Sequence, residues 1–309
     1  MPAPRLSVVL PTHNRAGELR HAIEALLRQT PSAGAYEVIV VANNCTDGTT
    51  DLLASIDDAR LKGITENHQG LSYARNTGIA ASAGDYVAFT DDDVEVAPDW
   101  VATLLHAFEA HPDVDGVGGR VLPSWPDACP GWLTRAHWAP LALQDHGDTR
   151  RVFDAATPIG LIGANVAFRR GVFARVGTFA AAVQRVRDGI GSTEDHEFLL
   201  RLYAAGGRML YLPKLVARAR VQPDRCVRTY HRRWHFGHGR FHALMRDPRI
   251  ERSRTYIFGV PGHLLHAAAR DAAHWFVSLL RRDDAEVFAT ELRLRFVAGF
   301  VRQRLRGAR

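Results

Sequence analysis

The sequence predicts an α/β protein with a mostly parallel sheet covered by helices on both faces, followed by a helical C-terminal extension. Short apolar, β-branched runs alternate with helix-period segments through the first 100 residues. These runs are almost continuously apolar, as strands buried on both faces are. After about residue 220 the strand signals give way to helical ones. We therefore expect an α/β domain in residues 1–220 and a helical extension in residues 221–309.

Four expected strands alternate with four expected helices before residue 111. The strands are residues 6–10, 36–41, 61–65 and 85–90, and the helices are 15–29, 49–55, 71–81 and 100–110. Ligands of such sheets bind at the carboxyl ends of the strands. The triplet Asp91-Asp92-Asp93 comes directly after the fourth strand, so we expect a site at this edge.

The rest of the chain carries weaker signals. Residues 120–160 are rich in Pro, Trp and Gly and predict a long loop, whereas residues 160–168 resemble a strand. A helix is expected from Ser192 to about Ala205, ended by Gly206-Gly207. A short strand at 209–213 precedes the extension, in which residues 263–280 and 285–306 predict two helices.

Composition predicts a cytoplasmic protein. The chain has 309 residues, of which 46% are hydrophobic and 23% charged, an ordinary composition for a globular protein. The sequence contains no run of about 18 apolar residues, so we expect no membrane-spanning helix. The first apolar run is too short for a signal peptide. Three widely spaced cysteines predict neither disulfides nor a metal knuckle.

The positive charge is concentrated in the extension. Residues 221–309 hold 18 arginines against 8 acidic residues, a net charge of +10, whereas residues 1–220 carry −4. Arginine bias also follows genomic base composition, so we expect no nucleic-acid partner. An anionic substrate or an anionic membrane surface fits the basic end equally well, and the inner face of the membrane is a second expected location.

The aspartate triplet is the first candidate site. Three adjacent carboxylates repel one another, and oxygen-rich sites suit Mg²⁺ or Mn²⁺ bridging a substrate diphosphate. An acidic turn that caps a helix explains the triplet alone equally well.

Three segments place the triplet in context. They are SVVLPTHNR, VIVVANNCTDGT and NHQGLSYARNTGIAASAGDYVAFTDDD. In order and spacing they resemble the GT-A glycosyltransferases of family 2 over about the first 220 residues. The resemblance implies a Rossmann-like GT-A fold and an inverting, metal-dependent transferase. Its donor would be a nucleoside-diphosphate sugar and its acceptor the hydroxyl of a glycan, a lipid-linked sugar or a small molecule, in envelope polysaccharide, glycolipid or natural-product glycosylation.

The resemblance also assigns donor-side residues. Pro11, Thr12 and Arg15 match the loop that holds the nucleoside, and Arg75 and Asn76 match a segment near the donor.

The same resemblance assigns the metal side. Asp93 would be the direct metal ligand, and Asp91 or Asp92 would face ribose or metal-bound waters. Where the family has a base-reading aspartate, this chain has Ala42. We expect Asn43 to hydrogen-bond the base instead, and the identity of the base stays open.

Glu194 and Asp195 form the second candidate site. In the family an acidic pair at a helix start supplies the catalytic base, and Asp195 matches it. A helix N-terminus favours an ionised carboxylate, which can accept a proton. The alternative is a simple capping box.

The third candidate lies in the extension. The run YHRRW at 230–234 partly resembles a family element in which Arg233 or Arg240 would contact the diphosphate and Trp234 would line the site. An amphipathic helix with a buried tryptophan is an equal alternative. His231, His235, His238 and His242 share helical spacing, but no carboxylate or cysteine completes a zinc site. We expect them to be solvated or to face substrate.

Two questions stay open at this level. The last helix, with Phe288, Leu292, Phe296 and Phe300, predicts packing onto the domain or a homodimer, and peripheral membrane contact is the alternative. A sugar-phosphate nucleotidyltransferase would need a pyrophosphate-binding loop after the first strand, and this sequence does not have one. A non-catalytic nucleotide-sugar or glycan-binding module remains the alternative to an enzyme.

Overall fold

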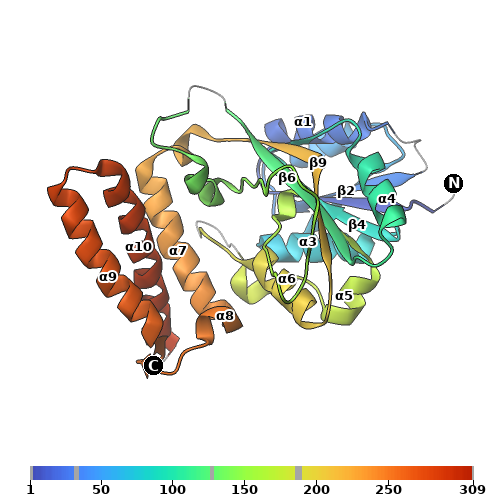
Figure 1. Cartoon of the computed structure of the whole chain (residues 1–309). Coiled ribbons are helices and arrows are strands. Elements are labelled where there is room, and N and C mark those ends of the chain that lie inside the picture. Colours follow the sequence, from blue (N-terminus) through green and yellow to red (C-terminus); the bar gives the residue numbers. More distant parts are fainter. Residues whose placement is uncertain (1–2, 31–34, 126–128, 185–189, 308–309) are drawn as a thin grey trace. The chain divides into compact units, whose positions relative to one another are not determined.

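The computed structural model describes residues 3–30, 35–125, 129–184 and 190–307, which form two compact units. The sheet unit comprises residues 1–126, 142–181 and 194–221, and the helical unit comprises 127–141, 182–193 and 222–309. Figure 1 shows the sheet in the first and a set of helices in the second. The roles that the sequence predicts for residues 1–220 and 221–309 stay predictions.

The sheet is parallel in its first half and mixed in its second. Strands β3 (Leu61–Glu66), β2 (Tyr36–Asn43), β1 (Leu6–Thr12) and β4 (Tyr86–Phe89) pair in this order, all parallel. Antiparallel β8 (Val166–Arg169) follows β4, and then come β6 (Gly116–Ser124), β9 (Met209–Arg220) and β5 (Val94–Val96), with β7 (Arg151–Phe153) pairing β9 at another point. This arrangement confirms the predicted fold class.

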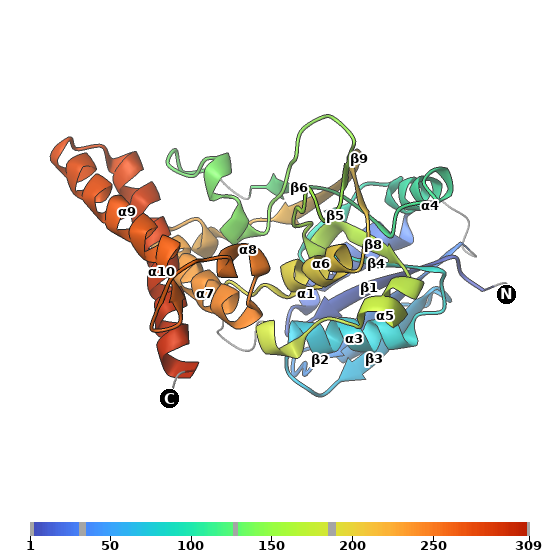
Figure 2. The same ribbon diagram turned by 60° about the horizontal axis from the view of Figure 1, so that its bottom comes forward.

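Helices cover both faces of the sheet (Figure 1). On one face α3 (Leu71–Ala81), α5 (Gly171–Val176) and α6 (Glu194–Ala204) share a buried apolar cluster with the strands. Figure 2 shows these three helices together in front of the sheet. On the other face lie α1 (Ala16–Leu27) and α4 (Trp100–Ala110), and the short α2 (Thr49–Ala54) precedes β3. Buried positions of α1 recur at Leu19, Ile23 and Leu26, the spacing of one helical face.

The prediction of a long loop at 120–160 is wrong in part. Its first residues complete β6, and β7 lies inside it, together with two 3-10 turns at Arg135–His137 and Ala139–Leu141. Residues 126–128 of this expected loop lie outside the described residues. The strand expected at 160–168 begins only at Val166, after a 3-10 turn at Gly163–Asn165. The expected strand at 209–213 extends to Arg220 because β9 pairs with β6 along most of its length.

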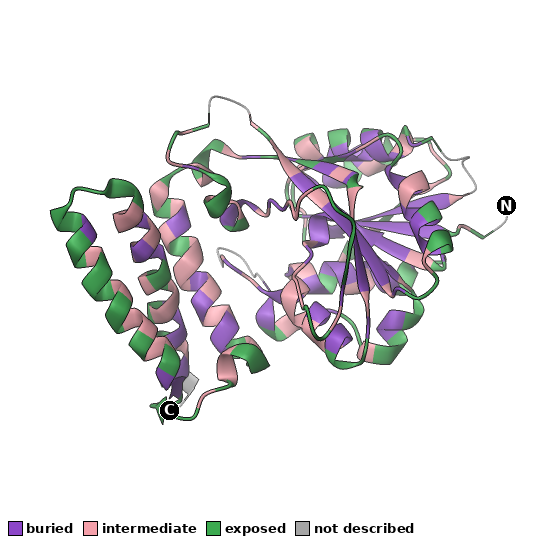
Figure 3. Ribbon diagram, viewed as in Figure 1, coloured by how far each residue is buried: buried purple, intermediate pink, exposed green. Residues whose placement is uncertain are grey.

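The helical unit is built on three helices. They are α7 (Arg228–Met245), α9 (Gly262–Leu280) and α10 (Asp284–Gly307), and α10 packs against both others. The short helix α8 (Pro248–Glu251) and a two-stranded hairpin, β10 (Tyr256–Ile257) with β11 (Val260–Pro261), connect α7 to α9. The two predicted C-terminal helices are confirmed. Much of α9 is exposed (Figure 3).

Glycines explain how α7 and α10 approach so closely. A Cβ added at Gly239 of α7 would lie 1.9 Å from the carbonyl oxygen of Phe296, and one at Gly299 of α10 would lie 1.9 Å from that of Phe236. Each helix therefore places a glycine against the backbone of the other. Glycine ordinarily weakens a helix interior, but α7 runs unbroken from Arg228 to Met245, and Gly239 allows its close packing on α10.

Within the described residues, no helix is both long enough and apolar enough to cross a membrane.

Candidate active site

The predicted site lies where three parallel strands end. β1 and β2 run in register to Thr12 and Ala42, and β4 lies beside β1 with Phe89 opposite Val9. The aspartate triplet therefore leaves the sheet at the edge where the loops after β1 and β2 also begin. All contacts described next, up to Asp195, lie within the sheet unit.

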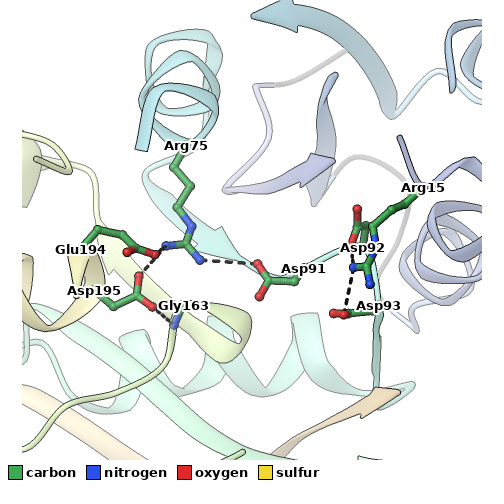
Figure 4. Close-up of polar contacts among 8 residues, drawn as sticks. All are labelled: Arg15, Arg75, Asp91, Asp92, Asp93, Gly163, Glu194 and Asp195. Carbon is green, nitrogen blue, oxygen red and sulfur yellow. Dashed lines mark hydrogen bonds and ion pairs between the residues drawn. The ribbon is translucent and has the colours of Figure 1, made fainter. Parts of the chain in front are cut away.

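One half of the site joins Arg15 to two of the aspartates. The Arg15 guanidinium donates to Asp92 Oδ1 at 2.7 Å and to Asp93 Oδ2 at 3.0 Å, as Figure 4 shows. Thr12 donates its hydroxyl to Asp92 Oδ2 at 2.8 Å. Burial raises the pKa of Asp92 to about 6 against the opposing charge of Arg15, and repulsion from Asp93 adds to the rise. The crowding of carboxylates is thus compensated by an arginine.

The other half is organised by Arg75 on α3, whose side chain is 2% exposed. Its Nη1 lies 2.5 Å from Asp195 Oδ1 and 3.3 Å from Glu194 Oε1, and its Nη2 lies 3.5 Å from Asp91 Oδ1 (Figure 4). Burial alone would lower the pKa of Arg75, but the charges of these three carboxylates outweigh it, and the pKa lies above its ordinary value. One cation therefore links the aspartate triplet to the acidic pair.

Gly163 completes the support of Asp195. Its backbone N–H donates to Asp195 Oδ2 at 2.9 Å, so both carboxylate oxygens are held. A Cβ at this position would lie 2.4 Å from Arg75 Nη2 and 2.7 Å from Asp195 Oδ1. The close approach requires glycine. Gly163 was not among the predicted site residues, and its signal in the sequence is the segment 160–163, with a glycine at each end, before a strand.

Two expected donor-binding amides are used within the fold. Asn43 donates both of its amide hydrogens, to the carbonyls of Glu66 and His68, and its Oδ1 accepts from the N–H of Gly70. Asn76 makes a two-way pair with the backbone of Phe179. Both side chains tie separate segments together, and both amide hydrogens of Asn43 are used within the protein. Pro11 lies on β1 in the described sheet and is buried.

The capping interpretation of the acidic pair finds no support in Thr193. Its hydroxyl is buried and makes no hydrogen bond within the described part of the chain. Asp195 instead lies in the first turn of α6 and points to Arg75 and Gly163.

The expected residues of the extension lie in the helical unit. Arg233 is exposed on α7, and the Trp234 ring stacks on His238 with centroids 4.2 Å apart. His231 is 0% exposed, in edge contact with Trp132, and the Nε2 atoms of His238 and His242 lie 3.0 Å apart. The expectation of solvated histidines is therefore wrong for His231 and for His242, which is also buried. No group of three or more metal-ligating side chains converges among the residues that the structure describes.

Comparison with known proteins identifies the family. A family model described as "Glycosyl transferase family 2" matches residues 7–177. A glucosyl-dolichyl phosphate glucuronosyltransferase of Haloferax volcanii is 29% identical over 211 residues, which are 67% of this chain and 66% of that protein. A validoxylamine A glucosyltransferase of Streptomyces hygroscopicus subsp. jinggangensis is 36% identical over 107 residues, or 34% of this chain and 25% of that protein.

Solved structures share the fold at lower identity. A mannosyltransferase from Pyrobaculum calidifontis, in complex with GDP-Man and Mn²⁺, superposes with a TM-score of 0.64 at 20% identity, covering 97% of this chain and 87% of its own. S. aureus TarS in complex with UDP-GlcNAc gives a TM-score of 0.57 at 16% identity, covering 97% and 92%. These likenesses show the GT-A fold.

The match to the family model covers more than half of the chain, whereas the matches span about two thirds or less of the length of the first curated relatives. The aspartate triplet, Arg75 and most of the sheet lie inside the matched residues. The chain belongs to glycosyl transferase family 2.

Proposed function

We propose that this protein is an inverting, metal-dependent glycosyltransferase that moves a sugar from a nucleoside-diphosphate sugar to a hydroxyl acceptor, with Asp195 as the base. The observation that carries the proposal is the position of Arg75, which holds Asp195 and faces Asp91 at the end of β4. A proton-accepting group and a diphosphate-side carboxylate are thus linked through one buried side chain.

The carboxylate of Asp195 is held in one orientation by two contacts. Arg75 and the Gly163 N–H fix its two oxygens, while about a quarter of the side chain remains exposed. In the proposed reaction this carboxylate takes the proton of the acceptor hydroxyl as the oxygen bonds to the anomeric carbon. The bond to the diphosphate oxygen breaks from the opposite side, so the configuration inverts.

The aspartates offer hard oxygen ligands for a divalent cation. Mg²⁺ and Mn²⁺ suit carboxylates, and Mg²⁺ is usually bound by one or two of them together with substrate phosphates. Asp91, whose side chain is 28% exposed, and Asp93 fit this pattern and would hold the ion. The bound ion would neutralise the charge that develops on the diphosphate. Asp92, buried between Thr12 and Arg15, would support the loop that holds the nucleoside.

The compared proteins support a nucleotide-sugar donor without fixing the base, since one holds GDP-Man with Mn²⁺ and another holds UDP-GlcNAc. The name of the Haloferax relative, a glucosyl-dolichyl phosphate glucuronosyltransferase, supports the lipid-linked sugar among the three acceptor classes. Because Asn43 has no amide hydrogen left, backbone groups or other side chains would have to read the base.

Asp195→Asn tests the base. The variant should lose at least about a thousandfold in turnover, within the range of general base catalysis, and should still bind the donor. Turnover is measured as nucleoside diphosphate released from a panel of nucleotide sugars with Mn²⁺, and donor binding by thermal shift. Asp57→Asn, which alters an exposed carboxylate in the same unit, is the matched control.

Near-normal turnover by Asp195→Asn would show that Asp195 is not the catalytic base. If the unaltered chain binds a donor but releases no nucleoside diphosphate with any acceptor supplied, a non-catalytic binding module is the better description. A chelator should abolish turnover, and added Mn²⁺ or Mg²⁺ should restore it.

A further inference from the structure

Five arginines line one pocket of the helical unit, between α7 and α10. The pocket has a volume of about 650 Å³, and its lining residues are Gln184, Ile190, Arg232, Arg233, Phe236, Gly237, Arg240, Phe241, Arg295 and Arg302. Such a density of guanidinium groups around one space is the arrangement that binds phosphate.

Only part of this charge is compensated by the described residues. Glu291 accepts from Arg232 at 2.9 Å and from Arg295 at 3.2 Å. Burial alone would raise the pKa of Glu291, but these two arginines outweigh it, so the pKa lies below its ordinary value and the carboxylate stays charged. One acid thus fixes two of the five arginines in place.

The other three arginines form no ion pair with any carboxylate that the structure describes. The Arg302 guanidinium lies over the Phe236 ring at 5.8 Å, and the Nε of Arg240 is buried without a hydrogen-bond partner. A buried donor of a charged group is costly when it is unsatisfied. The pocket therefore favours an anionic ligand.

Arg302 also lines a second, apolar groove. It lies between α9 and α10, has a volume of about 810 Å³, and is lined by Leu265, Ala268, Leu294, Val297, Ala298, Val301, Arg302, Leu305 and Arg306. Leu305 is 46% exposed. An apolar groove open to solvent marks a surface for a ligand or partner.

We infer that the pocket and the groove form one binding site for a phosphate ester carried on an apolar chain. The phosphate would lie among Arg233, Arg240 and Arg302, and the chain would lie along the groove between α9 and α10. Charge complementarity favours a phosphate head group, and because Arg302 lines both spaces, we expect an amphiphile rather than a purely polar anion.

This inference rests on the proposed function and deepens it, because it makes the acceptor a lipid-linked sugar whose phosphate is held by the helical unit. It also assigns Arg233 to that ligand rather than to the donor diphosphate. Trp234, the neighbour of Arg233 on α7, stacks on His238 and is not needed for the site.

The test is calorimetric titration of the full chain with decyl phosphate, a single-chain alkyl phosphate, below its micelle concentration. Arg240→Gln and Arg302→Gln should each weaken binding at least about tenfold, as the loss of a hydrogen bond to a charged group does. Val297→Asp, in the groove, should also weaken the binding of decyl phosphate. Arg281→Gln, which removes an exposed arginine of the same unit, should leave the affinity unchanged.

Three further probes separate the sources of binding. If inorganic phosphate binds as tightly as decyl phosphate, the apolar chain does not contribute to binding. If decanol binds as tightly, the arginines do not contribute. A nucleoside diphosphate that displaces decyl phosphate would assign the pocket to the donor and overturn the inference. Dimerisation that rises with concentration and is abolished by Val297→Asp would give the groove to a second copy.

The titration contains no sugar donor, so its result is independent of catalysis. Decyl phosphate binding with no turnover on any donor would refute the proposed function and keep the site. Turnover abolished by Asp195→Asn, without binding of decyl phosphate, would refute the site alone.

Discussion

Arg75 is the residue on which the candidate active site depends. It is buried on α3 and faces carboxylates from two distant parts of the chain, Asp91 and the pair Glu194-Asp195. Its guanidinium also lies 5.4 Å from the ring centre of Phe179. Removing a cation from such a cluster leaves buried carboxylates uncompensated, which typically costs about 3–5 kcal/mol. The same side chain therefore serves stability and the orientation of the proposed base.

Gly163→Ala tests this geometry without removing any charge. The added methyl group would meet Arg75 and Asp195 at distances that real Cβ atoms do not show, so the carboxylate must move. A displacement of about 1 Å can cost about a hundredfold in rate, whereas overpacking costs about 1–3 kcal/mol in stability. We expect turnover to fall by about that factor in a protein that still folds and binds donor.

Gly171→Ala is the control for this substitution, because no atom lies within 4 Å of the Cβ it adds. Equal turnover in Gly163→Ala and Gly171→Ala would mean that the tight contact around Asp195 has no catalytic consequence. Unfolding of Gly163→Ala would be seen as a lost thermal transition and is thereby distinguished from loss of turnover.

The residues of the site were only partly predictable from sequence. Asp91 and Asp195 stand out because they follow a strand and open a helix. Their link through Arg75 could not be read locally, since it joins residues 120 positions apart. Asn43 was expected to bind the base because it follows Ala42 at the family's base-reading position, but its amide hydrogens go to the carbonyls of Glu66 and His68.

At the scale of elements, the parallel half of the sheet was predictable, whereas in the mixed half only β8 and β9 were predicted, with other bounds. Strands β1 and β2 are apolar runs followed by helices, which local patterns reveal. Strand β6 contains Gly118, Gly119 and Pro123, which local rules assign to loops. It forms because β9, about 90 residues later, pairs with it and shifts register beside Gly119, where a Cβ would meet the backbone of Leu215.

The glycines of the helical unit give a prediction at this scale. Alanine at Gly239 or Gly299 would push a methyl group into the backbone of the facing helix. Alanine normally stabilises a helix interior by about 1 kcal/mol relative to glycine. Here we expect each substitution to lower the free energy of unfolding by about 1–3 kcal/mol, as overpacking does, measured by urea denaturation.

Gly17→Ala in α1 is the matched substitution, because the space around its Cβ is open. It should leave stability unchanged or raise it. If Gly239→Ala and Gly299→Ala behave like Gly17→Ala, then α7 and α10 can separate at no cost, and their close packing does not account for the glycines.

At the scale of the whole molecule, charge and titration are divided between the two units. The sheet unit places carboxylates beside Arg15 and Arg75, and the helical unit has the arginine pocket and buried histidines. Burial lowers the pKa of both His231 and His235 to about 4, with repulsion from His137 contributing to each. Asp92 is shifted the other way, to a pKa of about 6. Asp92 and these two histidines therefore contribute to the pH dependence of stability with opposite signs.

The histidines predict a loss of stability on acidification. Above pH 6.5 they are neutral in both the folded and the unfolded chain, so their contribution is complete. Between pH 6.5 and 4 the unfolded chain binds their protons and the folded chain does not, so stability falls as pH falls. Below about pH 4 the loss levels off. Asp92 acts in the opposite direction between pH 6 and 4, because its carboxyl takes up a proton in the folded chain first.

Comparison of variants isolates the histidines, since the contribution of Asp92 is common to all of them. Glutamine at 231 preserves an amide donor for the carbonyl of Arg225, which His231 Nε2 contacts at 3.2 Å, but does not titrate. The difference in Tm between pH 7 and pH 5 should be smaller in His231→Gln than in the unaltered chain, and smaller again when His235→Gln is added. Identical differences in all three proteins would show that these histidines are protonated in the folded chain, and that burial in the helical unit does not keep them neutral.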